Sequence, residues 1–231
     1  MDGVGKHDTS LIGVGLYAPA DAARLINVPA AKLARWLKGH GSGNRSYPPL
    51  WNRQIELIDG GLYLGFLDLI QSRMASAFIE AGLSAQKVRR ALVLARELID
   101  NEHPFATSRF RTDGRTLLLE ALTDAEDDRP LVDLFKRGQY VMRNVIEPSL
   151  KGIDFETDIA ARWWPKGRSS DIVLDPKRQF GQPIIESVGV PTAVLSAAAS
   201  AEGSVTRAAE MYRVSQEAVQ RAVDFELGLS A

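Results

Sequence analysis

Residues 18–39, APADAARLINVPAAKLARWLKG, decide the fold of the N-terminal part of the chain. The first half predicts a short helix over residues 21–26, which ends at Asn27-Val28-Pro29 because proline disfavours helix in the residue before it and suits the first turn of the next helix. The second half predicts a helix over residues 30–38, with an apolar stripe made of Leu33, Trp36 and Leu37. The segment therefore predicts two helices joined by a tight turn, a helix-turn-helix.

Charge is segregated along the chain, although 28 Lys and Arg residues nearly balance 29 Asp and Glu residues. Every charged residue between positions 22 and 55 is a cation: Arg24, Lys32, Arg35, Lys38, Arg45 and Arg53. An acid-free basic segment favours contact with a polyanion. The last thirty residues are net acidic, so we expect the C-terminal helices to pack or dimerise rather than enter a DNA groove.

A basic wing is expected after the two helices. The glycine-rich turn at residues 39–44 is followed by segments 47–50 and 55–64, which predict short strands with Arg45 and Tyr47 near the tip. Together with the basic helix, this wing predicts a DNA interface in which side chains of the second helix face the major groove and other cations contact phosphates. The alternative is a pair of helices with a solvated cationic face. The candidate DNA-binding residues are Arg24, Lys32, Arg35, Trp36, Lys38, Arg45, Tyr47 and Arg53.

The remaining pattern predicts a mostly α protein with small β elements, of the α+β class. Helices are expected over residues 66–80 and 84–99, a hairpin over 109–112 and 116–119 around Asp113-Gly114, a short helix over 131–138 and a strand over 171–174. Three C-terminal helices are expected over 191–201, 204–212 and 215–227, the last two capped by Ser204 and Ser215 and separated by a turn of helix-turn-helix spacing. We expect three regions: a DNA-binding domain (1–103), a middle region (104–170) and a C-terminal helical domain (171–231).

The sequence offers little for catalysis. It has no cysteine, which excludes disulfides, thiolate zinc sites and a cysteine nucleophile. Gly13-Val14-Gly15-Leu16-Tyr17-Ala18 matches a dinucleotide-binding loop, but Pro19 follows where a helix should open, and the acid that would hold a ribose is missing. The three histidines lie far apart. We therefore predict a non-enzymatic protein without metal or cofactor. Lacking a secretory signal or an apolar span, it is expected in the cytoplasm.

The middle region carries the candidate partner surface. An acidic cluster there consists of Asp124, Glu126, Asp127 and Asp128, without the spacing of a calcium loop. Trp163 and Trp164 are adjacent and precede a proline. They could stack a base or fill a small-molecule pocket, but such a pair more often places one ring in a core and the other against a partner. We interpret these six residues as candidate partner contacts.

Two resemblances extend these interpretations. Residues 17–29 with Leu33-Ala34-Arg35-Trp36 resemble the opening of the MerR-type winged helix-turn-helix, although Ala34 stands where that family usually has arginine. Ala81-Gly82-Leu83-Ser84 with Val88-Arg89-Arg90-Ala91-Leu92 looks like the family's helix after the wing. The resemblance covers about the first 100 residues and implies DNA binding.

The second half is similar to another family. Asp175-Pro176, Phe180-Gly181-Gln182-Pro183, Gly189-Val190-Pro191-Thr192 and residues 208–225 are similar to the small helical domain of bacterial antitoxins encoded beside PIN-like ribonuclease toxins. The combination resembles long VapB-type antitoxins. It implies a homodimer that binds its own operator DNA, represses its operon and neutralises a PIN-like toxin by direct binding. Two alternatives are a stand-alone MerR-like regulator with a ligand pocket near Trp163 or Trp164, and a hydrolase that uses the acidic cluster.

Overall fold

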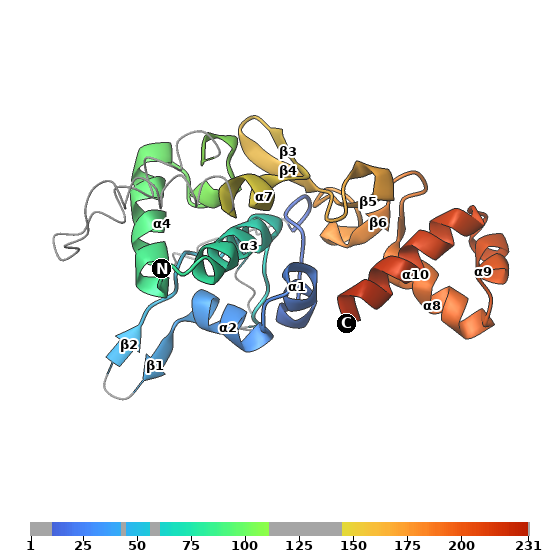
Figure 1. Cartoon of the computed structure of the whole chain (residues 1–231), viewed down its shortest axis with the longest axis horizontal. Helices are drawn as coiled ribbons and strands as arrows, with labels where there is room; N and C mark the ends of the chain where they lie inside the picture. Colours follow the sequence, from blue (N-terminus) through green and yellow to red (C-terminus); the bar gives the residue numbers. More distant parts are fainter. Residues whose placement is uncertain (1–10, 43–44, 56–60, 111–144, 231) are drawn as a thin grey trace, which may run out of the picture.

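The chain folds into an elongated arrangement of helices with a small sheet near its middle (Figure 1). The computed structural model describes residues 11–42, 45–55, 61–110 and 145–230. Helices α1 to α4 lie at one end of the molecule, and α8, α9 and α10 lie at the other (Figure 1). The mixture of helix and sheet is compatible with the expected α+β class.

The two predicted N-terminal helices are confirmed. Helix α1 spans Pro19–Ile26, two residues longer at its start than predicted, because Pro19 suits the first turn of a helix. It ends at Asn27, whose φ of 53° is left-handed, and α2 then spans Ala30–Lys38 as predicted. The apolar stripe of α2 is buried in the main core.

The hairpin after α2 differs from the predicted wing. Its strands are β1 (His40–Ser42) and β2 (Arg45–Tyr47), which pair antiparallel. The predicted strands 47–50 and 55–64 were wrong in the described residues: only Tyr47 belongs to a strand, and Leu64 makes one isolated bridge. Proline at 48 and 49 ends β2 because it has no N–H for a ladder. Gly39 closes the hairpin at φ 73°, where an added Cβ would lie 2.3 Å from the carbonyl oxygen of Tyr47.

Helices α3 (Phe66–Glu80) and α4 (Ala85–Ile99) were predicted closely. Ser84 caps α4 by accepting a 3.3 Å hydrogen bond from the Lys87 N–H. The 3-10 turn η1 (Pro104–Ala106) follows and is buried. Residues 108–110 are helical, so the predicted strand 109–112 is wrong at its start. The Phe110 side chain is fully buried, and its ring centroid lies 4.6 Å from that of Phe105. The rest of that hairpin and the predicted helix 131–138 lie outside the described residues.

A five-stranded antiparallel sheet links the two ends of the chain. After the short helix α7 (Glu147–Leu150) its order is β3 (Ile153–Glu156), β4 (Ile159–Trp163), β5 (Ile172–Leu174), β6 (Pro183–Ile185) and β7 (Val190–Pro191). The turns η3 (Arg168–Ser170) and η4 (Gln179–Gly181) lie between strands. Strand β5 confirms the prediction at 171–174. The expected boundary after residue 170 falls between β4 and β5 of this single sheet.

The three predicted C-terminal helices are confirmed. They are α8 (Thr192–Glu202), α9 (Val205–Tyr212) and α10 (Gln216–Ser230). Both predicted serine caps form: Ser204 accepts from the Arg207 N–H at 3.3 Å, and Ser215 accepts from the Ala218 N–H at 3.1 Å. The helices share a small core with Ile172 of β5 and Ile185 of β6, separate from the main cluster. No helix within the described ranges is long and apolar enough to cross a membrane.

The glycine-rich segment before α1 is hydrogen-bonded to the turn η4 beside the sheet. Tyr17 donates a 2.7 Å hydrogen bond from its buried hydroxyl to the Gly181 carbonyl, and the Leu16 N–H donates to the Phe180 carbonyl at 2.9 Å. A Cβ on Gly15 would lie 3.1 Å from the Tyr17 ring and 3.3 Å from Phe66. The pattern that matches a dinucleotide loop therefore serves close packing here.

Candidate nucleic-acid interface

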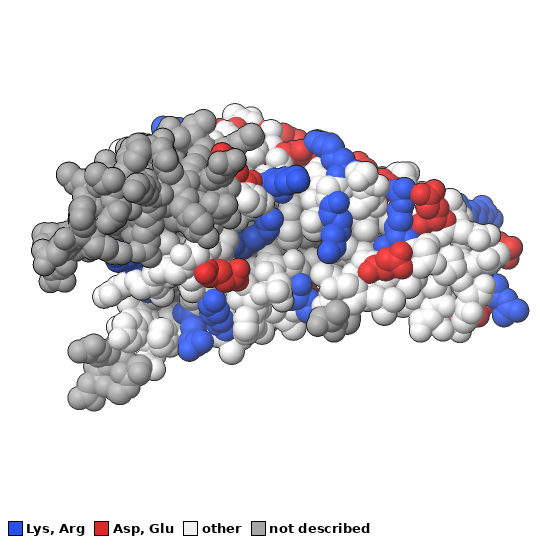
Figure 2. Space-filling view, viewed as in Figure 1, with Lys and Arg blue, Asp and Glu red and all other residues white. Residues whose placement is uncertain are grey.

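The outer face of α2 carries three cations. Because Leu33, Trp36 and Leu37 are buried, the opposite side of the helix faces solvent. Arg35 and Lys38 are exposed on it, and Lys32 is half-buried. Among the described residues, no carboxylate forms an ion pair with any of the three. Lys and Arg side chains lie around α2 and α1 in Figure 2, and others lie over the sheet. The structure thus brings these cations together on one accessible helix.

Trp36 takes a different place from these cations. Its side chain is only 6% exposed and belongs to the main core, and Nζ of Lys32 lies 5.1 Å from the centroid of the ring. Sequence reasoning placed it both on the apolar stripe and among the DNA contacts. The burial corrects the second assignment: Trp36 holds α2 in place and supports the Lys32 ammonium.

The hairpin brings the remaining predicted residues close to α2. Tyr47 is 37% exposed, and its ring stacks on His40 with the centroids 4.9 Å apart. Arg45 belongs to β2, but its side chain lies outside the description. Arg53 is half-buried in the loop after the hairpin. Tyr47 and Arg45 therefore lie on one small hairpin next to the end of α2.

A buried carboxylate that sequence reasoning missed positions this hairpin. Asp68 in α3 accepts hydrogen bonds from the Trp51 indole at 3.0 Å and the Gln54 N–H at 2.9 Å, and lies 3.0 Å from His103 Nε2. It also accepts from the Gly65 N–H at 3.0 Å, as an acid in the first turn of a helix can. A buried carboxylate needs several such partners. Asp68 therefore ties the loop after the hairpin to α3.

Further hydrogen bonds fix the hairpin against α2 and α4. Arg89 of α4 donates to the carbonyls of Pro48 and Pro49 at 2.6 Å and 2.9 Å, and the Leu50 N–H donates to the Trp36 carbonyl at 2.7 Å. The sequence signal for this role is weak, because the arginine is 40 positions away from the carbonyl it binds. These bonds keep the hairpin and the basic face of α2 in one arrangement.

Arg24 connects the interface to the other end of the chain. Its guanidinium lies 3.6 Å from the carboxylate of Glu226 in α10. The same carboxylate accepts a 2.5 Å hydrogen bond from the Thr192 hydroxyl of α8. A predicted phosphate contact is therefore adjacent to an acid of the C-terminal helices.

The two tryptophans among the candidate partner contacts are buried. Trp163 and Trp164 are 3% and 6% exposed. The Trp164 indole donates to Asp154 at 2.9 Å, while the Arg168 guanidinium lies 4.9 Å from its ring centroid. Both rings are therefore packed, including the one expected to lie against a partner. The acidic cluster Asp124, Glu126, Asp127 and Asp128 lies outside the described residues.

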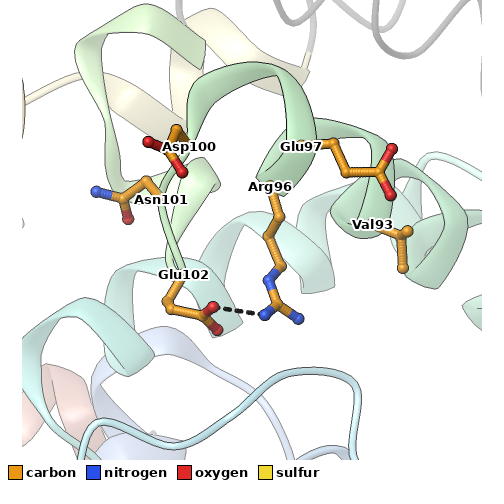
Figure 3. A pocket seen from close by; sticks show the side chains of 6 residues that line it. All are labelled: Val93, Arg96, Glu97, Asp100, Asn101 and Glu102. Carbon is orange, nitrogen blue, oxygen red and sulfur yellow. Dashed lines mark hydrogen bonds and ion pairs between the residues drawn. The ribbon is translucent and has the colours of Figure 1, made fainter.

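An open pocket of about 450 Å³ lies at the C-terminal end of α4. It is lined by Val93, Arg96, Glu97, Asp100, Asn101 and Glu102 (Figure 3). Arg96 donates to Glu102 at 2.5 Å, and Glu97 and Asp100 lie apart on either side of this pair (Figure 3). In the described part of the chain no group of three or more histidines and acids is placed to hold a metal ion. Three acids and one arginine line this pocket, so it does not share the positive charge of the α2 face.

The chain is similar to a curated relative and to a solved structure. No family model matches the chain. The "Putative antitoxin VapB45" of Mycobacterium tuberculosis H37Rv is 29% identical over 227 residues, which cover 91% of this chain and 93% of the relative. The crystal structure of Rv2018 from Mycobacterium tuberculosis superimposes with a TM-score of 0.71 at 26% identity, covering 92% of this chain and 99% of that one. The chain is therefore similar, over most of its length, to a protein named as an antitoxin.

Proposed function

We propose that this protein is the antitoxin of a toxin–antitoxin pair, which neutralises a PIN-like ribonuclease toxin by direct binding and represses its own operon at operator DNA. The similarity to VapB45 over 91% of the chain carries this proposal, because it spans far more than one small module. An antitoxin implies a toxin partner. The PIN-like class of that toxin rests on the resemblance of the C-terminal segment to antitoxins of this kind.

The basic face of α2 supports the DNA-binding part of the proposal. Lys32, Arg35 and Lys38 project from a helix whose apolar stripe is fixed in the core, as a groove-reading helix requires. Arg24, Arg45, Arg53 and Tyr47 would contact the backbone on either side. An operator with two half-sites is bound by a homodimer, one protomer at each half-site.

Two surfaces suit the toxin. The cluster Asp124, Glu126, Asp127 and Asp128 would complement the basic cleft that a ribonuclease needs for RNA. On the C-terminal helices, the apolar side chains of Met211 and Leu227 are 58% and 65% exposed, which is the kind of area that a protein partner buries. Trp163 and Trp164 are buried, so they would contribute to partner binding only through their packing.

Native co-purification tests the toxin assignment. The protein is tagged at its own locus and isolated at mild salt, and its partners are identified by mass spectrometry. We expect a small nuclease in near-stoichiometric amount, whose RNA cleavage is inhibited when the purified protein is added back. Recovery of a dimer carrying only DNA would instead favour the stand-alone ligand-responsive regulator.

Fluorescence anisotropy tests the DNA assignment. The labelled duplex is the region upstream of the protein's own gene, compared with a scrambled duplex. We expect Arg35→Ala to weaken specific binding by about 1 to 3 kcal/mol if Arg35 makes a bidentate base contact. Arg207→Ala, which removes an exposed cation from α9, is the matched control and should change little. Equal affinity of both variants and the parent protein would contradict the assignment.

A further inference from the structure

A second basic feature lies away from the outer face of α2. A cleft of about 790 Å³ opens between the turn from α1 to α2, residues 163–166 and the last turns of α10. Among the described residues that line it are three cations, Arg24, Arg73 and Lys166, and no acid. Arg24 lies 3.6 Å from Glu226, so Arg73 and Lys166 supply the positive charge that favours an anion in the cleft.

Arg73 is the innermost of these cations. Its guanidinium lies 5.0 Å from the centroid of the Trp163 ring, and burial lowers its pKa to about 10. Its Nη2 donates to the Pro148 carbonyl at 3.5 Å, but its Nη1 is buried without a hydrogen-bond partner, and no described carboxylate pairs with the guanidinium. The Nε1 of Trp163 is likewise buried and has no partner among the described residues. Buried cations are nearly always paired, so this wall of the cleft favours an added anion.

The other walls supply one more cation and an apolar surface. Lys166 is exposed and forms no ion pair with any described residue. Ile26 and Pro29, at the turn from α1 to α2, line the cleft as well. Phe225 and Leu229 of α10 line the opposite side. The cleft therefore combines cationic groups with apolar walls.

We propose that this cleft binds a small organic anion, in which a phosphate or carboxylate group is attached to an apolar body. Arg73 and Lys166 hold the anionic group, and Trp163, Phe225 and Leu229 contact the body. The volume lies within the range of about 300 to 1,000 Å³ typical of small-molecule sites. The site does not depend on the antitoxin role, since none of its chemistry involves a toxin.

Isothermal titration with simple probes tests the proposal. Phenyl phosphate and benzoate carry both features, phenol carries only the apolar body, and inorganic phosphate carries only the charge. We expect saturable one-to-one binding of phenyl phosphate or benzoate, and weaker or no binding of phenol and inorganic phosphate at equal ionic strength. Quenching of tryptophan fluorescence, absent in Trp163→Phe, gives a second readout from the cleft itself.

Two variants and a control connect binding to the cleft. Arg73→Gln and Lys166→Gln should each weaken phenyl phosphate binding at least tenfold, whereas Lys151→Gln, an exposed lysine outside the cleft, should change it less than twofold. Lys166 is exposed, so its variant reports on binding even if Arg73→Gln fails to fold. Circular dichroism melting separates loss of folding from loss of binding.

Three outcomes would overturn the proposal. The first is the absence of saturable binding of both anions in the millimolar range, and the second is binding that Lys166→Gln leaves unchanged. The third is a role in DNA backbone contact: no anion binds, but Arg73→Gln and Lys166→Gln each reduce the salt slope for an unrelated duplex by about 1. Toxin capture in the co-purification experiment is independent of these results.

Discussion

The N-terminal helix pair, α1 and α2, and the C-terminal helix pair, α9 and α10, share one turn geometry. Asn27 and Arg213 both end their helices in the left-handed region, with φ of 53° and 54°. The next residue in each case is valine, and the N–H groups of Val28 and Val214 donate to carbonyls five residues earlier, both at 3.0 Å. Such a bond satisfies a carbonyl that the end of a helix leaves open. The same backbone solution is thus used twice in this chain.

The two pairs differ in what surrounds that turn. Counted in residues from Asn27 and Arg213, Ala22 corresponds to Ala208 and Leu33 corresponds to Val219. All four side chains are fully buried. Outside the core, Lys38 corresponds to Asp224 and Arg24 to Glu210, whereas Arg35 corresponds to Arg221. Two acids of the C-terminal pair are engaged within it: Glu217 pairs with Arg221 at 2.7 Å and Asp224 accepts from Gln220 at 2.8 Å. The buried positions set the geometry, and the exposed charges determine what each pair can bind.

The largest expected effect tests the buried positions that the two helix pairs share. Leu33→Ala should lower the free energy of unfolding by about 2 to 5 kcal/mol, because it opens a cavity in the main core. Val219→Ala, at the corresponding position of α10, removes less volume and should cost about 1 to 3 kcal/mol. Urea denaturation followed by circular dichroism measures both. If the order were reversed, the C-terminal pair would be the better packed of the two.

The next effect tests the charge difference directly. The double variant Arg35→Glu, Lys38→Glu should weaken DNA binding about 100-fold or more, since it turns attraction to phosphates into repulsion. The matched double variant Arg207→Glu, Arg213→Glu makes the same charge change on the C-terminal pair and should weaken binding less than threefold. Anisotropy titrations over a range of salt concentrations measure both. Similar losses for the two variants would mean that the C-terminal pair also lies on DNA.

Local patterns predicted the helices well. The stop at Asn27-Val28-Pro29 and the serine caps at Ser84, Ser204 and Ser215 are short-range signals, and each ended or began a helix where expected. The basic face of α2 followed from the apolar stripe, because burying one side of a helix exposes the other. What the sequence determines within one or two helical turns could therefore be predicted.

The strands depend on distant contacts and were mostly missed. Strands β3 and β4 meet at Thr157-Asp158, whose φ values of 46° and 76° are those of a tight primed turn, but these residue types are weak signals for it. Arg73 reaches Trp163, and Asp68 reaches His103, only because the fold brings them together. The cleft and the carboxylate that positions the hairpin were for this reason invisible in the sequence.

A smaller effect concerns the joint between the two regions. Tyr17→Phe removes the hydrogen bond to Gly181 and should lower the free energy of unfolding at pH 7 by about 1 to 2 kcal/mol. Burial, with the nearby charge of Asp175, raises the pKa of Tyr17 far above its usual value. A raised folded-state pKa gives stability that is complete below the unfolded value near 10 and is lost as pH rises above it.

Denaturation curves at several pH values check this sign. The parent protein should lose stability more steeply than Tyr17→Phe above about pH 10, so the two curves converge. Parallel curves from pH 8 to pH 11 would show that Tyr17 ionises as easily in the folded protein as in the unfolded one. The burial of its hydroxyl would then have to be incomplete in solution.

The smallest effect lies at the contact between α1 and α10. Glu226 is the acid nearest to Arg24 in the C-terminal helices, 3.6 Å away, and Arg24 is one of the proposed phosphate contacts. Glu226→Gln removes a negative charge that competes with DNA for this cation, so DNA binding should become about two- to fivefold tighter at low salt and the gain should shrink at high salt. Glu202→Gln, which neutralises an acid at the far end of α8, should leave affinity unchanged. A weaker complex in Glu226→Gln would instead mean that this carboxylate orients Arg24 toward the phosphates, and that the C-terminal helices assist the N-terminal pair in holding DNA.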